Sequence, residues 1–421
     1  MIFMSENFYA CIDLKSFYAS VECVERGLDP FKANLVVADP ARGERAICLA
    51  VSPALKELGV PNRCRTFQIP DGIEYITALP RMKLYMKYSA DIYSIYLKYI
   101  SRDDIHVYSI DECFIDLTPY LDLYNKTAKE MVVLLMDAVF KETGICATAG
   151  IGTNMFLAKV ALDVTAKHVD DHIGFLDLDE FKKTIWHHKP ITDIWNIGRG
   201  IANRLQKYGV SDLYGVAHMD EKILYKEFGV NAEYLIDHSH GIEPCTIKEI
   251  HEYKSKGSSI SNSQVLFEDY SFEDALVVLK EMVDLLSLEL TEKHLVSDSI
   301  SLYIGYSKSS AKSTGGTRKL YEYTNTYSKL AACFEEFYLS TAKHNCPIRR
   351  ITVGVNNVVE DCYIQMNLFD EALSEKERKA QEAVLQIKNK FGKNAVLRGI
   401  SLEEKATGRM RNKLIGGHNG E

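Results

Sequence analysis

The sequence predicts a multidomain protein of the α+β class. The chain has 421 residues, too many for one ordinary core, so we expect two to four domains of roughly 100–200 residues. Strand-like and helical segments are mixed up to about residue 177. Residues 258–362 then follow the order β-α-β-β-α-β, which is typical of a ferredoxin-like sheet module.

The N-terminal part begins with a short apolar run, "FYACIDL" (8–14), which ends in an acid and is expected to form the first strand. "AICLAVSPALKELGV" (46–60) predicts a strand leading into a helix, which Gly59 is suited to end because glycine readily adopts left-handed conformations. The other expected elements are helices at 15–28, 80–100, 128–144 and 154–167 and strands at 34–40 and 146–152.

The rest of the chain changes character twice. Residues 178–246 predict helical segments, and residues 247–257 form a polar link. In the following module, alternation places Ile300, Leu302, Ile304 and Tyr306 on one strand face, between amphipathic helices at about 273–293 and 327–344. A last strand places Ile351, Val353 and Val355 on one face. Residues beyond 362 are polar and low in aromatic side chains.

Composition excludes several classes of protein. The chain is 46% hydrophobic and 26% charged, and no apolar run approaches the ~20 residues of a membrane span. The N-terminus has no basic region or cleavage site, which argues against a signal peptide. The ten cysteines form no C-x-x-C pair, so we expect reduced thiols in the cytoplasm and no zinc site.

The net charge of −8 argues against a nucleic-acid-binding protein only if charge is spread evenly. Local patches decide such binding, and the segment "KSSAKSTGGTRK" (308–319) has four basic residues and no acidic one. The chain can therefore carry a basic groove despite its acidic balance.

Three carboxylates stand out, because "VYSIDECFIDL" (107–117) places Asp111 and Glu112 side by side within an apolar stretch and Asp13 ends the first strand. If Asp111 and Glu112 form the tip of a β-hairpin, all three side chains can meet at one sheet edge. Carboxylates crowded in this way need a cation, and magnesium prefers such oxygen ligands. The alternative is structural, with Asp13 as a helix N-cap and the Asp111–Glu112 pair in a turn.

The segments "DLKSFYASVE" (13–22) and "YSIDECFIDL" (108–117) resemble the two signature segments of the Y-family, UmuC-type translesion DNA polymerases. The resemblance covers about residues 8–362. It implies a right-hand polymerase with palm, fingers and helical thumb, and an additional ferredoxin-like little finger domain. The implied domains are the palm (1–22 and 79–177), fingers (23–78), thumb with a helix-hairpin-helix (178–246), linker (247–257), little finger (258–362) and a tail (363–421).

The resemblance also implies the catalytic residues. Asp13, Asp111 and Glu112 match the catalytic metal ligands of the family, and the backbone carbonyl of Leu14 would complete the set. The implied cofactor is a pair of Mg²⁺ ions, with Mn²⁺ as a possible substitute, because two metals stabilise the attacking and leaving oxygens in phosphoryl transfer.

Four residues are implied in dNTP binding. Tyr18 matches the steric gate that rejects a ribose 2′-OH, and Phe17 beside it fits a place in the core equally well. Lys159 matches a palm lysine that contacts the triphosphate, although a snorkelling surface lysine is the alternative. In the fingers, Pro53 and Lys56 stand where many relatives have a Tyr and an Arg. Lys56 can still bind phosphate, as a point charge without bidentate geometry.

DNA contacts are expected in two places. "WNIGRGIANRLQKYGV" (195–210) resembles a helix-hairpin-helix, in which Gly198 and Gly200 let the backbone approach a phosphate. In the little finger, the basic loop would contact the duplex backbone through Lys308, Lys312, Arg318 and Lys319, and a solvated charged turn is the alternative.

The tail contains "QMNLF" (365–369), which resembles the peptide that binds the bacterial sliding clamp. Gln365, Leu368 and Phe369 would fill a pocket on that partner, or the segment would pack back on the little finger. The implied function is low-fidelity, template-directed DNA synthesis across damaged bases, with primer-template DNA and dNTP as substrates. The sequence leaves open a need for damage-response accessory proteins. Two further hypotheses are a palm-type nucleotidyl cyclase and a non-catalytic DNA-binding factor.

Overall fold

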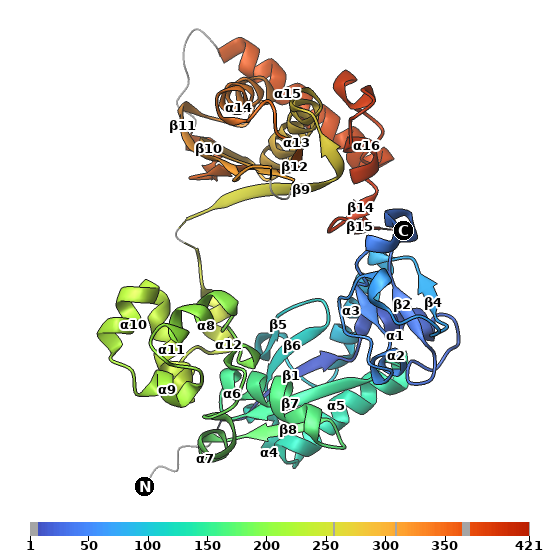
Figure 1. The fold of residues 1–421 in the computed structure, drawn as a ribbon, viewed down its shortest axis with the longest axis vertical. Helices are drawn as coiled ribbons and strands as arrows, with labels where there is room; N and C mark the ends of the chain where they lie inside the picture. Colours follow the sequence, from blue (N-terminus) through green and yellow to red (C-terminus); the bar gives the residue numbers. More distant parts are fainter. Residues whose placement is uncertain (1–6, 256, 308–309, 364–370, 421) are drawn as a thin grey trace. The chain divides into compact units, whose positions relative to one another are not determined.

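The computed structural model describes residues 7–255, 257–307, 310–363 and 371–420 (Figure 1). The chain divides into two compact units, Met1–Tyr253 and Lys254–Gly420. No helix within these described ranges is long and apolar enough to cross a membrane.

The first unit is built around a five-stranded sheet with the order β5-β6-β1-β7-β8. Its central strand β1 runs antiparallel to both neighbours, β6 and β7, and β8 is parallel to β7. The strands are β1 (Tyr9–Leu14), β5 (Ile105–Val107), β6 (Glu112–Asp116), β7 (Ala147–Gly152) and β8 (Ile173–Leu176).

Helices cover both faces of this sheet. Cys11 of β1 packs in one cluster with Met155 and Ala158, which belong to α6 (Met155–Val160). On the other face, Ile12 and Leu14 line a small hollow with Ile92 and Tyr96. Those two residues belong to α3 (Met82–Tyr96), which contacts α5 (Ala128–Thr143). A short helix, α4 (Thr118–Tyr124), follows β6.

Close packing of α6 on β7 requires glycine at two positions. A side chain at Gly150 would place its Cβ 2.1 Å from the carbonyl oxygen of Ala158, and one at Gly152 would lie 2.3 Å from the Ala158 amide nitrogen. The helix that carries Lys159 can therefore lie directly on the sheet beside the acidic edge.

A small second sheet lies in the region predicted as fingers, with the order β3-β2-β4. Its strands are β2 (Leu35–Val37), β3 (Ala50–Val51) and β4 (Ile76–Ala78). The helix α1 (Phe17–Val24) packs against β2 and β3. As predicted, the strand β3 leads into a helix, α2 (Pro53–Glu57), and Gly59 adopts a positive φ of 86° just beyond it.

The predicted thumb is helical, with α7 (Leu178–Glu180), α8 (Arg199–Gln206), α9 (Leu213–Ala217), α10 (Glu221–Phe228) and α11 (Ala232–Ser239). The prediction of a linker at 247–257 was wrong in its first half, because α12 (Ile247–Glu252) is a helix. Thr246 and Glu249 form a capping box at its start, and Ile247 is buried against Tyr9 and Phe114 of the sheet.

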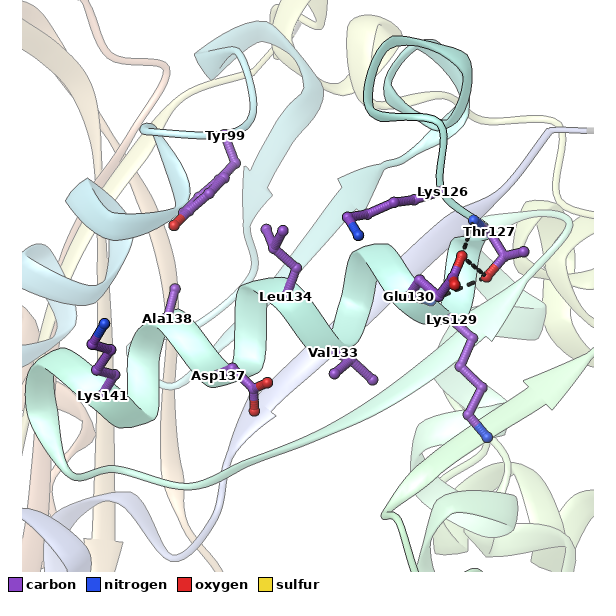
Figure 2. A pocket seen from close by; sticks show the side chains of 10 residues that line it. All are labelled: Tyr99, Lys126, Thr127, Lys129, Glu130, Val133, Leu134, Asp137, Ala138 and Lys141. Atoms are coloured by element: carbon purple, nitrogen blue, oxygen red, sulfur yellow. Dashed lines mark hydrogen bonds between the residues drawn. The ribbon is translucent and has the colours of Figure 1, made fainter.

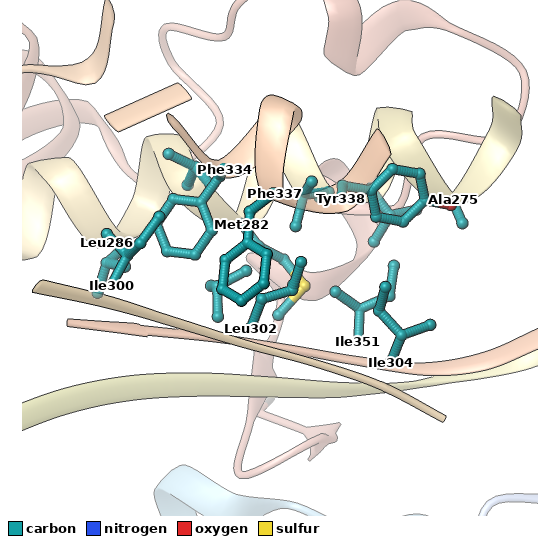
Figure 3. Packing of buried hydrophobic residues seen from close by; sticks show 14 of the residues in the cluster. Ala275, Met282, Leu286, Ile300, Leu302, Ile304, Phe334, Phe337, Tyr338 and Ile351 are labelled. Atoms are coloured by element: carbon teal, nitrogen blue, oxygen red, sulfur yellow. The ribbon is translucent and has the colours of Figure 1, made fainter. Parts of the chain in front are cut away.

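The second unit confirms the predicted β-α-β-β-α-β order. Its antiparallel sheet has the order β11-β10-β12-β9. In chain order its elements are β9 (Ser259–Tyr270), α13 (Phe272–Glu292), β10 (Leu295–Tyr306), β11 (Thr314–Thr324), α14 (Tyr327–Thr341) and β12 (Ile348–Asn356). Figure 3 shows Ile300, Leu302 and Ile304 pointing from the strands towards Met282 and Phe337 of the two helices.

The segment predicted as a polar tail is folded where the structure describes it. It contains α15 (Glu371–Phe391), α16 (Gly408–Arg411) and a short hairpin of β14 (Leu414–Ile415) and β15 (His418–Asn419), and it belongs to the second unit. Before it, β13 (Val359–Glu360) pairs with β10.

Buried polar contacts attach this segment to the module. Gln381 of α15 donates to Thr291 Oγ1 at 2.7 Å, and Glu281 of α13 accepts from the amide of Thr407 at 2.8 Å. A polar, aromatic-poor composition was therefore a misleading sign of a free tail, because these polar groups find partners inside the fold.

Candidate active site

The acidic edge of the five-stranded sheet joins residues about 100 positions apart in the sequence. Asp13 pairs directly with Glu112 in the β1–β6 register, and the Leu14 amide donates to the Asp111 carbonyl at 2.9 Å. Val107 pairs with Cys113, so Asp111 lies in the turn of a hairpin. The three predicted carboxylates are brought together, as the hairpin hypothesis required.

The Asp13 carboxyl is poorly stabilised as an anion. Burial, followed by the negative charges of Asp111 and Glu112, raises the pKa of Asp13 to about 7. Among the described residues, no donor is hydrogen-bonded to this carboxylate. A bound cation or a proton would therefore stabilise the carboxylates at this edge.

Lys159 lies against this edge. Its Nζ is 2.7 Å from Glu112 Oε1 and 3.0 Å from Asp163 Oδ2, and Cys11 Sγ donates to the same Glu112 oxygen at 3.0 Å. Burial alone would lower the pKa of Lys159, but the negative charge of its neighbours outweighs burial and raises it. In this structure Glu112 and Asp163 are the anionic partners of Lys159, whereas the predicted partner was a triphosphate. The snorkelling alternative is wrong because the side chain is buried.

Two of the three carboxylates have partners within the protein. Asp111 Oδ1 accepts from Ser109 Oγ at 2.6 Å, while Glu112 contacts Lys159 and Cys11. Within the part of the chain that the structure describes, no three His, Cys, Asp or Glu side chains form a metal-binding group. The donor set nonetheless fits a hard divalent cation, because it consists of carboxylate oxygens and one of them lacks a hydrogen-bond donor.

Tyr18 and Phe17 begin α1 but have different surroundings. Phe17 is 2% exposed, which supports its place in the core. Tyr18 is partly exposed and stacks on Tyr85, with ring centroids 4.5 Å apart and an interplanar angle of 17°. Burial and the negative charge of Asp111 raise the pKa of Tyr18.

The charge of Lys56 interacts with this edge and with two further lysines. Burial lowers the pKa of Lys56, the Asp13 charge opposes that shift, and the charges of Lys15 and Lys167 add to it. Lys15 and Lys167 were not predicted as site residues. Lys15 could have been found from its position two residues after Asp13. Lys167 could not be predicted from the sequence, because only the fold brings its charge close to Lys56.

Pro53 occupies the first turn of α2, behind a cap in which the Ser52 hydroxyl accepts from the Leu55 amide at 3.3 Å. Proline is well suited to that position because the amide it lacks has no helical partner there. A structural preference at the helix start thus accounts for the departure at Pro53, and the charge of Lys56 in α2 interacts with that of Asp13.

Gly198 and Gly200 lie at the start of α8 and are exposed, with open space where a side chain would stand. This geometry leaves the backbone accessible, as the helix-hairpin-helix hypothesis requires.

The predicted basic loop does not form one patch. Arg318 pairs with Ile300, lies on the helix side of the sheet and packs over Phe337 at 4.2 Å. It also contacts Glu336 at 3.3 Å, so its charge is directed away from the opposite sheet face. Lys319 pairs with Ser299 on that opposite face, and Lys312 is exposed. Lys308 lies outside the described residues, as do Gln365, Leu368 and Phe369.

A separate hollow of about 680 Å³ follows α5 (Figure 2). Lys126, Lys129 and Lys141 line it together with Glu130 and Asp137. Figure 2 shows Glu130 bonded to Thr127, where the two residues form the capping box of α5. No predicted site residue lines this hollow, and its charges are of mixed sign, unlike those of the acidic edge.

The first unit combines a five-stranded sheet, a small three-stranded sheet and a helical region, and the second is a ferredoxin-like module, which together fit the fold of a right-hand polymerase. Comparisons with known proteins identify the family. A model described as the impB/mucB/samB family matches residues 12–163, and its C-terminal domain model matches 258–368. The chain belongs to this family, which comprises the Y-family translesion DNA polymerases.

Individual relatives agree. The chain is 31% identical to a putative UV-damage repair protein, UvrX, of Bacillus subtilis over 97% of this chain and 96% of that protein. It is 28% identical to DNA polymerase IV 2 of Halalkalibacterium halodurans over 97% and 98% of the two chains. A solved Y-family polymerase chimera matches with a TM-score of 0.64 at 19% identity, covering 84% of this chain and 99% of that chain, which supports the fold.

The chain is therefore a DNA-directed DNA polymerase of translesion synthesis, with DNA and dNTP as substrates. Polymerases of this family generally depend on divalent metal ions. The cyclase and the non-catalytic hypotheses find no support in these comparisons.

Proposed function

We propose that the acidic edge of β1 and β6 is the catalytic centre, where the primer 3′-OH attacks the α-phosphate of a dNTP and pyrophosphate leaves. The observation that carries this proposal is that Asp13 pairs directly with Glu112 and that, among the described residues, no donor is hydrogen-bonded to the Asp13 carboxyl. The reaction that we propose for this site is low-fidelity synthesis across damaged template bases.

The carboxylates of Asp13, Asp111 and Glu112 and the carbonyl of Leu14 would hold two Mg²⁺ ions, or Mn²⁺ as a substitute. When bound, the ions neutralise charge on the triphosphate and increase the acidity of the attacking hydroxyl. The chain's own part is to fix these oxygens on a rigid strand pair, so that little reorganisation is needed during the reaction.

Lys159 and Lys56 bind the triphosphate. Lys159 is buried and ion-paired with Glu112, and phosphate oxygens offer it a second anionic partner. Arrival of the triphosphate would therefore loosen Lys159 from Glu112 and free that carboxylate. Lys56, with Lys15 and Lys167 nearby, supplies positive charge from the fingers side in place of the Arg that many relatives have.

Tyr18 is the steric gate. The Asp111 charge acts on its hydroxyl, which supports a ring position where it would overlap a ribose 2′-OH and thereby select deoxynucleotides. Phe17 beside it supports the position of α1 from the core.

The duplex and the partners are contacted elsewhere. Gly198 and Gly200 offer backbone amides to a phosphate, and Lys308, Lys312 and Lys319 provide salt-sensitive contacts in the little finger. The peptide at 365–369 binds the sliding clamp through Gln365, Leu368 and Phe369. Damage-response accessory proteins are further candidate partners, and the place of action is the cytoplasm.

Primer extension on intact and lesion-containing templates tests the proposed centre. Asp111→Asn should lower extension by about 1,000-fold or more, because it removes a charge on which the reacting groups depend. Asp116→Asn changes the same residue type at the far end of β6 and should leave extension within about twofold. Extension by Asp111→Asn at the wild-type rate would place the catalytic centre elsewhere.

A further inference from the structure

The proposed steric gate does not stand alone. The ring of Tyr18 is stacked on Tyr85 of α3, nearly parallel and with centroids 4.5 Å apart. Tyr85 is completely buried, whereas Tyr18 is partly exposed. One face of the gate ring is therefore set by a side chain that cannot move into solvent.

Tyr85 is in turn fixed by a buried acid. Its hydroxyl donates to Glu22 Oε1 at 2.7 Å, and Glu22 has 0% exposure. Arg81, one helical turn before Tyr85, binds the same carboxylate with two hydrogen bonds of 3.0 and 2.7 Å. Arg26 makes a further ion pair with Glu22.

This acid is held as an anion. Burial would raise the pKa of Glu22, but the hydrogen bonds from Arg81, Tyr85 and Arg26 outweigh burial and lower it. A charged hydrogen-bond network in a core has few alternative arrangements, whereas apolar packing tolerates several. The orientation of the Tyr85 ring is thus determined more strictly than packing alone would require.

From this geometry we infer that Tyr85, held by Glu22, is a positioning residue for sugar selection: it sets the angle at which the Tyr18 ring meets the incoming nucleotide. The inference rests on the proposed role of Tyr18 as the gate. Tyr85 itself does not touch the sugar. It limits the freedom of the Tyr18 ring to tilt away from a 2′-OH, and a ring that can tilt is a weaker barrier.

The chain contains a matched control. Tyr88 lies one turn further along α3 and donates to Glu25 Oε1 at 2.7 Å, so it forms the same kind of contact between the same two segments. In the described part of the chain, no ring contact joins Tyr88 to Tyr18. If the loss of any Tyr–Glu bond lowers sugar selection, variants at Tyr85 and Tyr88 should both show it. If the effect acts through the gate, only variants at Tyr85 should show it.

The test measures kcat and KM for single-nucleotide insertion of a dNTP and the matching rNTP by the full-length protein. Tyr85→Leu removes the supporting ring and should lower the dNTP-over-rNTP preference by about tenfold. The change should come from a lower KM and higher kcat for the rNTP, with dNTP kinetics nearly constant. Tyr88→Leu should leave the preference unchanged. An unchanged preference in Tyr85→Leu, or an equal loss in both variants, would overturn the inference.

Two further variants separate the possible failures. Tyr18→Ala should lower the preference more than Tyr85→Leu does, and no change in Tyr18→Ala would refute the gate itself. If Tyr18→Ala loses the dNTP-over-rNTP preference and Tyr85→Leu keeps it, only the positioning role is refuted. If Tyr85→Leu does not fold, Tyr85→Phe keeps the ring and removes the bond to Glu22. It should lower the preference by about threefold, and wild-type preference there overturns the inference.

Discussion

Two carboxylates, one partly and one completely buried, lie nine positions apart in the same segment and have opposite surroundings. Asp13 at the end of β1 faces Asp111 and Glu112, and its pKa is raised to about 7. Glu22 in α1 is buried completely, yet hydrogen bonds from Arg81, Tyr85 and Arg26 lower its pKa. Burial alone therefore does not distinguish a functional acid from a structural one. The difference is whether the fold itself supplies the cationic and hydrogen-bonding partners.

From this comparison we expect mutations in the two regions to change the free energy of unfolding differently. The network around Glu22 is complete within the protein, so it stabilises the fold whether or not a ligand is bound. The edge around Asp13 is incomplete, so its charges oppose folding until a cation arrives. The two regions should respond in opposite directions when a charge is removed.

The largest expected effect is on the free energy of unfolding. Glu22→Gln should lower it by about 3 kcal/mol, because two arginines would lose their buried counter-charge and an amide group would face them. Asp13→Asn should leave it unchanged or raise it, because like charges at the edge are reduced. Urea unfolding without divalent ions measures both. A loss of stability in Asp13→Asn as large as that in Glu22→Gln would contradict the comparison.

The second expected effect is on the pH dependence of stability, to which the two sites should contribute with opposite signs. The pKa of Asp13 is raised in the folded state, so between about pH 4 and 7 the folded chain binds more protons there and stability falls as pH rises. The pKa of Glu22 is lowered, so its contribution is present above the unfolded pKa and is lost as pH falls through the folded pKa.

Unfolding midpoints at pH 5 and pH 7.5 measure this difference. Relative to Asp13→Asn, the wild type should lose on the order of 2 kcal/mol over that interval, a value reduced from the full shift because the site is partly exposed. Added Mg²⁺ should restore stability at pH 7.5 in the wild type and have little effect in Asp13→Asn. An equal response of both proteins to Mg²⁺ would show that the ion binds elsewhere.

The sequence predicted the strands of the acidic edge and the ferredoxin-like module because both depend on local patterns. Asp13 and Glu112 each lie in a short apolar strand, and Ile300, Leu302 and Ile304 alternate along one strand. Such periods can be found in a single segment without knowledge of its partners.

Contacts between distant polar groups could not be predicted in that way. Gln381 is buried because it bonds to Thr291 and Asn325, which are 90 and 56 positions away. The helix α15 therefore looked like a solvated tail. Arg318 was expected on a DNA-binding surface, but strand alternation places it opposite Lys319, where Phe337 and Glu336 engage it. Sequence gives the charge of such a residue, whereas the register of the strand decides its face.

The smallest expected effect concerns Lys159, which is ion-paired with the acidic edge and which we propose contacts the triphosphate. Lys159→Met keeps the length of the side chain and removes the charge that Glu112 and Asp163 now share. The KM for dNTP should rise by about tenfold, since one charge-assisted phosphate contact is lost. The fall in kcat should be smaller, because the carboxylates remain.

Steady-state insertion kinetics at saturating Mg²⁺ measure this change, and Lys183→Met is the control. Lys183 also pairs with a carboxylate, Glu180 at 2.9 Å, but it is exposed on the predicted thumb. Its replacement should leave both constants within about twofold. A kcat loss in Lys159→Met with no change in KM would mean that this lysine orders Glu112 and does not bind the triphosphate. Its role would then be structural, like that of the arginines around Glu22.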